Sequence, residues 1–214
     1  MAKVGVVLCG CGMYDGSEVH EATLSLLFLS QAGAEIFCMA PDVDQADVVD
    51  HVKDKPMAEK RNALLEAARI ARGNITDIKK VKASDIDALV LPGGVGAAKT
   101  LSTFAADGAN MTVNPEVARL VTEVHAAGKP IGFVCIAPVI AAKVLKATVT
   151  IGNDPGVAAA ITQMGGKHVN CPANDIVFDE KNRVVSTPAY MLGEVISDIA
   201  PGIEKLAKQV MKLI

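Results

Sequence analysis

The chain has 214 residues, of which 50% are hydrophobic, 21% are charged and 3% are aromatic, with no tryptophan. This length and apolar content suffice for a domain with a large core and argue against intrinsic disorder. The net charge of −3 gives no electrostatic reason to expect nucleic acid or an anionic membrane as a partner. Because the apolar residues are mainly Ala, Val, Ile and Leu, we expect an α/β protein with a buried parallel sheet.

No apolar stretch predicts a membrane-spanning helix. One of the longest, residues 131–144, is interrupted by Gly132, Pro138 and Lys143. The apolar residues 4–8 run into Gly, Tyr and Asp rather than into a small-residue cleavage site, so we expect a first strand there and not a signal peptide.

The cysteines do not suggest a disulfide framework. Their number is odd and most lie inside apolar runs: Cys9, Cys11, Cys38, Cys135 and Cys171. This pattern is typical of reduced thiols in a cytosolic or matrix-like compartment, and we expect a cytoplasmic protein. A metal site that gathered some of these thiols with His20 and His51 would lack the paired C-x-x-C spacing of structural zinc, so no metal site is expected.

Strand-like apolar runs alternate with amphipathic helical stretches along the chain. The expected strands are Val4–Cys9, Glu35–Ala40, Asp87–Leu91 and Pro130–Cys135, followed by a hairpin of Ile176–Phe178 with Val184–Ser186. The expected helices are Ser17–Gln31, Glu59–Ala71, Pro115–Ala127, a stretch after Cys135 to about Leu145, Val157–Met164 and Met191–Leu213. Residues 42–58 are polar and are expected to form a loop or insertion. The alternation predicts a three-layer, doubly wound, mostly parallel sheet in a single domain spanning residues 1–214.

In such a sheet, functional groups collect where strands end and helices begin. Three of these junctions are unusual in sequence: Cys9–Glu21, Pro92–Thr100 and Cys135–Pro138. The glycines of Gly10-Cys-Gly12-Met-Tyr-Asp-Gly16 are spaced one residue too long for a dinucleotide fingerprint, and acidic neighbours would repel a pyrophosphate. The stretch Gly93–Thr100 has Ala98 where a P-loop requires Gly. Neither turn predicts a nucleotide site.

The third junction places Cys135 at the end of a strand, directly before a helix that opens with Ile136-Ala-Pro138. A strand-to-helix elbow exposes its residue above the sheet and directs helix-start amides at it. Such amides lower the pKa of a thiol and favour the nucleophilic thiolate. A buried structural cysteine fits the same position, and the position alone does not separate the two interpretations.

Two motifs together resemble a known superfamily. Val90-Leu-Pro-Gly-Gly94 followed by Gly132-Phe-Val-Cys135-Ile-Ala-Pro138 is similar to the ThiJ/PfpI superfamily, whose domains share the class I glutamine amidotransferase-like, flavodoxin-like fold. Further stretches resemble its ElbB branch, described as isoprenoid biosynthesis proteins with an amidotransferase-like domain: Ser17-Glu-Val-His-Glu-Ala22, Ala67-Ala-Arg-Ile-Ala-Arg-Gly73, Gly94-Val-Gly-Ala-Ala-Lys-Thr-Leu-Ser102 and Thr187-Pro-Ala-Tyr-Met191. The similarity covers essentially the whole chain.

The resemblance implies a cofactor- and glutathione-independent glyoxalase that converts glyoxal or methylglyoxal into the hydroxy acid, in a homodimer. By matching position it implies Cys135 as the nucleophile, Glu21 as the carboxyl group beside it, and backbone donors at Gly94 and Ile136 on the oxyanion side. Two departures matter. Ile136 stands where many members have a His after the nucleophile. Thr187-Pro-Ala-Tyr190 stands where glutaminases of this fold have a His-x-Glu, so glutamine hydrolysis is not predicted.

The implied chemistry starts with attack of the Cys135 sulfur on an aldehyde, and Glu21 then moves a proton between the two substrate carbons. We expect burial to keep one shared proton on this pair near neutral pH. The alternative is a non-catalytic redox or stress-response protein in which Cys135 is oxidised, because a protonated Glu can hold a sulfinate. Only the family's name suggests a role as an interaction module of isoprenoid synthesis.

Overall fold

The computed structural model describes all residues, 1–214, and its centre is a seven-stranded sheet in the order β10-β11-β7-β6-β1-β2-β5. The strands are β1 (Lys3–Val7), β2 (Glu35–Ala40), β5 (Thr76–Asp77), β6 (Ala88–Leu91), β7 (Ile131–Val134), β10 (Val177–Asp179) and β11 (Val184–Thr187). Every neighbouring pair is parallel except β10 with β11. The order β2-β1-β6-β7-β11 is the flavodoxin-like one, so the predicted doubly wound sheet is confirmed.

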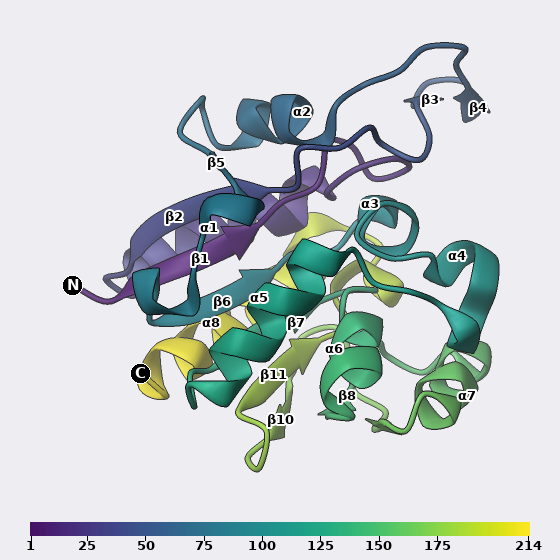
Figure 1. Ribbon diagram of the computed structural model, residues 1–214. Helices are drawn as coiled ribbons and strands as arrows, with labels where there is room; N and C mark the ends of the chain where they lie inside the picture. Colours follow the sequence, from purple (N-terminus) through teal and green to yellow (C-terminus); the bar gives the residue numbers. More distant parts are fainter.

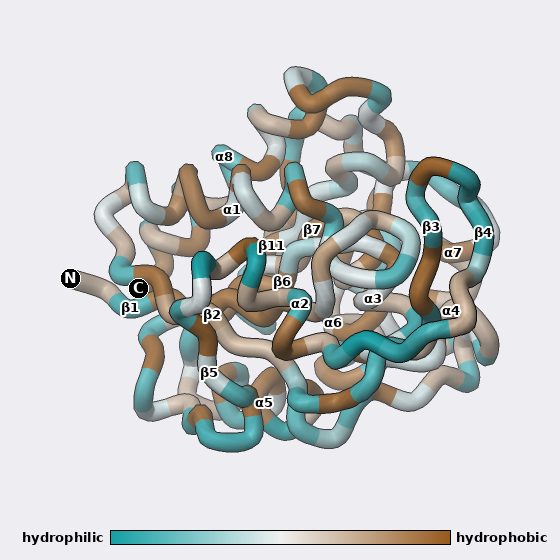
Figure 2. The backbone as a smooth tube through the Cα atoms, turned by 90° about the horizontal axis from the view of Figure 1, so that it is seen from above, coloured by the Kyte–Doolittle hydropathy of each residue, from teal (hydrophilic) through white to brown (hydrophobic).

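Helices cover both faces of this sheet. They are α1 (Val19–Gln31), α2 (Ala63–Ile70), α3 (Val95–Lys99), α4 (Phe104–Asp107), α5 (Pro115–Ala126), α6 (Pro138–Leu145), α7 (Pro155–Gln163) and α8 (Ile196–Lys212). Helices α5 and α6 lie in front of the sheet in Figure 1, with α1 and α8 behind it. The view in Figure 2 shows the strands between the α1–α8 side and the α5 side. None of the helices has the length and apolar character needed to cross a membrane.

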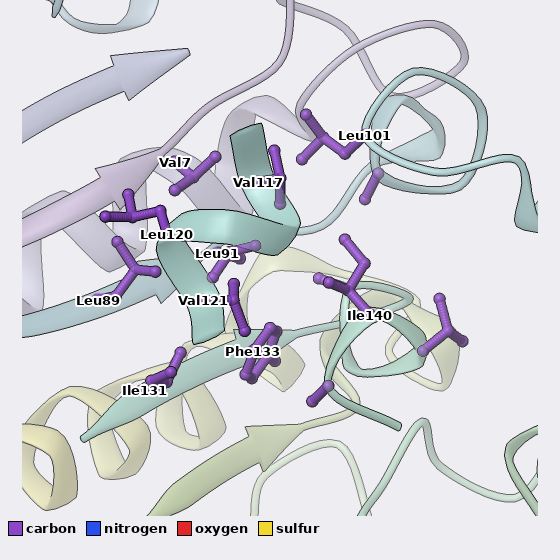
Figure 3. Close-up of a cluster of buried hydrophobic side chains, with 14 of the residues drawn as sticks. Val7, Leu89, Leu91, Leu101, Val117, Leu120, Val121, Ile131, Phe133 and Ile140 are labelled. Atoms are coloured by element: carbon purple, nitrogen blue, oxygen red, sulfur yellow. The ribbon is translucent and has the colours of Figure 1, made fainter. Parts of the chain in front are cut away.

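The central strands are apolar on both faces because both faces are covered. All residues of β6 and β7 are buried. On one side Leu91 and Phe133 pack with Leu120 of α5 and Ile140 of α6 (Figure 3). On the other side strand residues pack against α1 and α8. Full burial of one such side chain contributes about 1.5–3 kcal/mol, so the core holds the carboxyl ends of the strands firmly in place.

The helix starts that differ from prediction have local causes. Helix α2 begins at Ala63 because the Asn62 side chain accepts the N–H groups of Leu64 and Leu65 and thus caps the helix. The last helix begins at Ile196 and not at Met191. Before it, a 3-10 turn over Ala189–Met191 follows the end of β11.

Short elements were not predicted because two residues carry too little periodicity. The edge strand β5 is one of them. The expected loop 42–58 contains a hairpin of β3 (Val49–Asp50) and β4 (Lys55–Pro56), and a separate parallel pair is formed by β8 (Thr148–Val149) and β9 (Lys167–His168). Further 3-10 turns cover Ile78–Lys80, Ala83–Asp85 and Gly108–Asn110.

Candidate active site

The candidate site lies above the carboxyl ends of β1, β6, β7 and β11, where the three unusual junctions meet. In Figure 1 this end of the sheet is opposite to the end that carries both termini. The Glu18 N–H donates to the Gly93 carbonyl at 2.9 Å and joins the first junction to the second. The Cys135 N–H donates to the Thr187 carbonyl, also at 2.9 Å, and joins the third junction to the end of β11.

Cys135 occupies a strained elbow between β7 and α6. Its φ is +62°, in the left-handed region that costs a non-glycine residue roughly 1–2 kcal/mol. Such strain persists only where the surrounding structure enforces it, and it is frequent at functional sites. The residue is 8% exposed, so its sulfur is almost covered but not sealed. The structure therefore contains the elbow that the sequence predicted.

Glu21 lies in the first turn of α1 and is completely buried. Its two carboxyl oxygens accept two backbone N–H groups, from Gly93 to Oε2 at 3.1 Å and from Tyr190 to Oε1 at 3.2 Å. The same carboxyl group lies beside the side chain of Cys135. A β-carbon on Gly93 would clash with both Cys135 and Glu21, so glycine is required between the two groups.

The backbone amides of Gly94 and Ile136 are the two groups on the oxyanion side, and both act to lower the pKa of the Cys135 thiol. Gly94 has a φ of +102°, and a side chain there would clash with the backbone of Gly16 and Glu18. The close approach of this amide to the sulfur thus depends on glycine. The four predicted site residues Cys135, Glu21, Gly94 and Ile136 are brought together, whereas their catalytic roles stay predictions.

The electrostatics of the pair differ from what the sequence indicated. Burial, and then the charge of Glu21, raise the pKa of the Cys135 thiol well above its usual value. The amides of Gly94 and Ile136 do lower this pKa, but they are outweighed. The expectation that helix-start amides would produce a low-pKa thiol was therefore wrong, because a covered sulfur loses more from dehydration than it gains from two donors.

Glu21 has its pKa raised to about 8, chiefly by burial and further by Glu18, while the amide of Tyr190 opposes the shift. With this value about a tenth of the molecules have lost this proton at pH 7. The pair consequently reaches the expected state with one shared proton only as the pH approaches 8. At pH 7 the carboxyl and the thiol are both mostly neutral.

Sequence reasoning missed two residues beside the pair. His20 precedes Glu21 in α1 and is exposed, and its Nδ1 lies 2.8 Å from the Tyr190 hydroxyl. The ring centroids are 5.9 Å apart, so the contact is a hydrogen bond rather than a stack. No sequence spacing links residues 20 and 190. The only available signal was that the Thr187–Tyr190 segment follows a strand of the same sheet.

Known proteins similar to the chain fall into one group, although no protein-family model matches it. The chain is 48% identical over 223 residues to glutamine amidotransferase-like class 1 domain-containing protein 3, mitochondrial, of Homo sapiens, covering 99% of the chain and 83% of the relative. It is 34% identical over 231 residues to the mitochondrial ES1 protein of Danio rerio, covering 99% and 86%. A solved isoprenoid biosynthesis protein with amidotransferase-like domain from Ehrlichia chaffeensis has 39% identity and a TM-score of 0.93, covering 100% of the chain and 99% of that structure.

The flavodoxin-like sheet, with a cysteine on a left-handed elbow and a glutamate beside it, has the amidotransferase-like fold, which solved DJ-1 superfamily proteins share. A DJ-1 variant from Schizosaccharomyces pombe shares the fold at 17% identity, with a TM-score of 0.57 over 98% of the chain and 90% of that structure. The chain belongs to the ES1 family, as its full-length similarity to the curated relatives shows.

The predicted cytoplasmic location is contradicted by these relatives. The human and zebrafish proteins, and the ES1 protein homolog of Rattus norvegicus at 48% identity, are all named as mitochondrial. The prediction was wrong because it rested on free cysteines. Free cysteines indicate the absence of a disulfide framework, and they do not distinguish the cytosol from a mitochondrial matrix.

Proposed function

We propose that the chain is a cofactor- and glutathione-independent glyoxalase that converts glyoxal or methylglyoxal into the corresponding hydroxy acid. The observation that carries the proposal is the set of partners around one sulfur. A β-carbon on Gly93 would clash with both the Cys135 side chain and Oε2 of Glu21, so the two groups lie side by side, and the amides of Gly94 and Ile136 lower the pKa of the thiol. A nucleophile, a proton carrier and two fixed donors are what an aldehyde isomerisation requires.

The first step is addition of the thiol to the aldehyde carbon. The ionised form of Glu21 accepts the Cys135 proton while the sulfur forms its bond to carbon 1. The oxygen on carbon 1 gains the electron pair of the broken carbonyl π bond and lies within reach of the amides of Gly94 and Ile136. Glu21 then passes its proton to this oxygen, which leaves a neutral hemithioacetal and regenerates the carboxylate.

The second step moves a hydrogen between the two carbons. Glu21 removes the hydrogen on carbon 1 as a proton, and the electron pair forms an enediol with carbon 2. Glu21 then returns the proton to carbon 2. The hydroxyl proton on the oxygen of carbon 1 moves to the oxygen of carbon 2, and carbon 1 becomes the carbonyl carbon of a thioester. Carbon 1 is thus oxidised and carbon 2 reduced by the same two electrons, so no external oxidant is needed. Water then breaks the carbon–sulfur bond, which releases the hydroxy acid and the thiol.

The exposure of the pair favours a small substrate. Glu21 is fully buried, and Cys135 exposes only 8% of its surface. A two- or three-carbon dicarbonyl needs less room beside such covered groups than a bulky carbonyl compound does. This observation supports glyoxal and methylglyoxal as substrates.

The test is turnover of methylglyoxal by protein freed of metal and of small thiols. Cys135→Ala should abolish formation of lactate. Cys171→Ala is the matched control because this buried cysteine has the same 8% exposure and belongs to no part of the site. Equal rates in wild type and Cys135→Ala would refute the proposal.

The alternative function, oxidation sensing at Cys135, has geometric support because the amides of Gly94 and Ile136 suit sulfinate oxygens as well. The raised thiol pKa works against it, because the thiolate reacts with peroxide and the thiol does not. Peroxide titration followed by peptide mass spectrometry separates the two functions. Oxygen gained at Cys135 alone, in a preparation without turnover, would favour the sensor.

A homodimer, expected from the resemblance, is also a proposal. Multi-angle light scattering of the purified chain at micromolar concentration should give twice the mass of 22.2 kDa. A monomeric mass under these conditions would refute it.

A further inference from the structure

We propose that His20 and Tyr190 form a clamp that positions the Glu21 carboxyl group and is required for its proton transfer. The proposal rests on the proposed function and names positioning residues for the same site. It starts from an arrangement outside the cysteine–glutamate pair. Two consecutive residues of α1 bind the same residue of the turn after β11.

The clamp has an outer and an inner hydrogen bond. Outside, Nδ1 of His20 lies 2.8 Å from the Tyr190 hydroxyl. Inside, the Tyr190 N–H donates to Oε1 of Glu21 at 3.2 Å. The two bonds close a ring between α1 and the 3-10 turn Ala189–Met191, so the outer bond restrains the residue that makes the inner one. Because a hydroxyl both donates and accepts, the outer bond forms with neutral as well as with protonated His20.

The inner bond matters because it acts on the ionisation of Glu21. The Tyr190 amide is the strongest of the groups that lower the pKa of this carboxyl, which burial and Glu18 raise. The other titratable groups that face the clamp are Cys135, which lies beside Glu21, and Asp198 of α8, whose charge acts on Tyr190. A looser Tyr190 amide would leave Glu21 less ionised at a given pH, and fewer molecules would be ready to accept the thiol proton.

Tyr190→Phe tests the clamp with little other change. It removes the hydroxyl but keeps the ring that covers the site and the backbone N–H. We expect the pH midpoint of Cys135 alkylation by iodoacetamide, followed by peptide mass spectrometry, to move about half a pH unit downward, because a less ionised Glu21 repels the thiolate less. Methylglyoxal turnover at pH 7 should fall about three- to tenfold and should recover at higher pH, since each pH unit is a factor of ten in the ionised fraction.

Three variants of single groups accompany it. His20→Ala should reproduce the shift of the alkylation profile. His20→Asn keeps an acceptor near the position of Nδ1 and should have a profile close to that of the wild type. Tyr14→Phe is the matched control because it alters the other tyrosine, which contacts His51 with ring centroids 5.0 Å apart and takes no part in the bonds between α1 and Tyr190. It should leave the profile unchanged.

The alkylation profile needs no turnover, so it decides about the clamp even if the chain proves not to be a glyoxalase. An unchanged or alkaline-shifted profile in Tyr190→Phe would overturn the clamp. So would a shift in Tyr190→Phe that His20→Ala does not share, or an equal shift in Tyr14→Phe. A loss of turnover that is equal at every pH would show a merely structural role and would overturn it as well.

Discussion

Glu21→Gln changes one atom in the centre of the site and has consequences that can be worked out from its contacts. Both carboxyl oxygens accept a backbone N–H, one from Gly93 and one from Tyr190. Glutamine offers one acceptor oxygen and one NH₂ group, so one of these two N–H groups faces another donor. Leaving a buried donor without its partner costs about 1–3 kcal/mol.

The pH dependence of stability opposes the cost of the lost acceptor in Glu21→Gln. The folded pKa of Glu21, about 8, lies above its ordinary value of 4.5. The contribution of Glu21 to the free energy of unfolding is therefore fully present below pH 4.5. It is lost as the pH rises to about 8, because the unfolded chain releases the Glu21 proton first. This loss amounts to roughly 4 kcal/mol by pH 8, and glutamine does not suffer it. The variant should be less stable than wild type at pH 5, and the difference should vanish or reverse at pH 8.

Urea denaturation at the two pH values measures this directly, and turnover of methylglyoxal measures the chemistry. Loss of general acid–base catalysis should lower turnover by about 10²–10⁴-fold, while the variant stays folded. Glu123→Gln is the matched control, since it makes the same chemical change in α5, outside the site. A stability difference between Glu21→Gln and wild type that does not depend on pH would refute the buried titrating carboxyl. Turnover at the wild-type rate would refute the proton shuttle.

Three further substitutions are each expected to have a different effect on activity and stability. Glu18→Gln removes a charge that raises the pKa of Glu21, so the pH–rate profile should move to lower pH; an alkaline shift would contradict this sign. Gly93→Ala places a methyl group against Cys135 and Glu21, and it should lower stability by about 1–3 kcal/mol and remove most turnover; a variant of unchanged activity would show that the pair tolerates separation. Asn114→Ala removes the cap of α5, far from the site, and should cost about 1 kcal/mol in thermal or urea unfolding with turnover intact; lost activity in the folded variant would contradict the placement of the site.

The sequence was sufficient for the parts of the fold that repeat a pattern. Strand β2 was predicted with the bounds that the structure has, because five apolar residues follow Glu35 and end at Pro41. Helix α5 was predicted within one residue, because Asn114 and Pro115 together mark a helix start. The elbow at Cys135 followed from the same logic, since a strand passes directly into a helix that opens with Pro138.

What the sequence did not provide depends on burial and on distant contacts. A motif shows that amides point at Cys135 but not how much water the sulfur has lost, and so the direction of its pKa shift was missed. The His20–Tyr190 bond joins residues 170 positions apart, and only the folded sheet brings α1 beside the end of β11. The location was missed for a different reason, because free thiols are compatible with more than one reducing compartment.

The most direct test of the cysteine mechanism is rapid acid quenching of the protein during turnover of methylglyoxal, followed by intact-mass and peptide analysis. The thioester intermediate should appear as one added substrate mass on Cys135. It should be absent in Cys135→Ala and should decay with a rate consistent with lactate formation. Turnover without a covalent adduct on Cys135, or an adduct confined to another cysteine such as Cys11, would contradict the proposed mechanism.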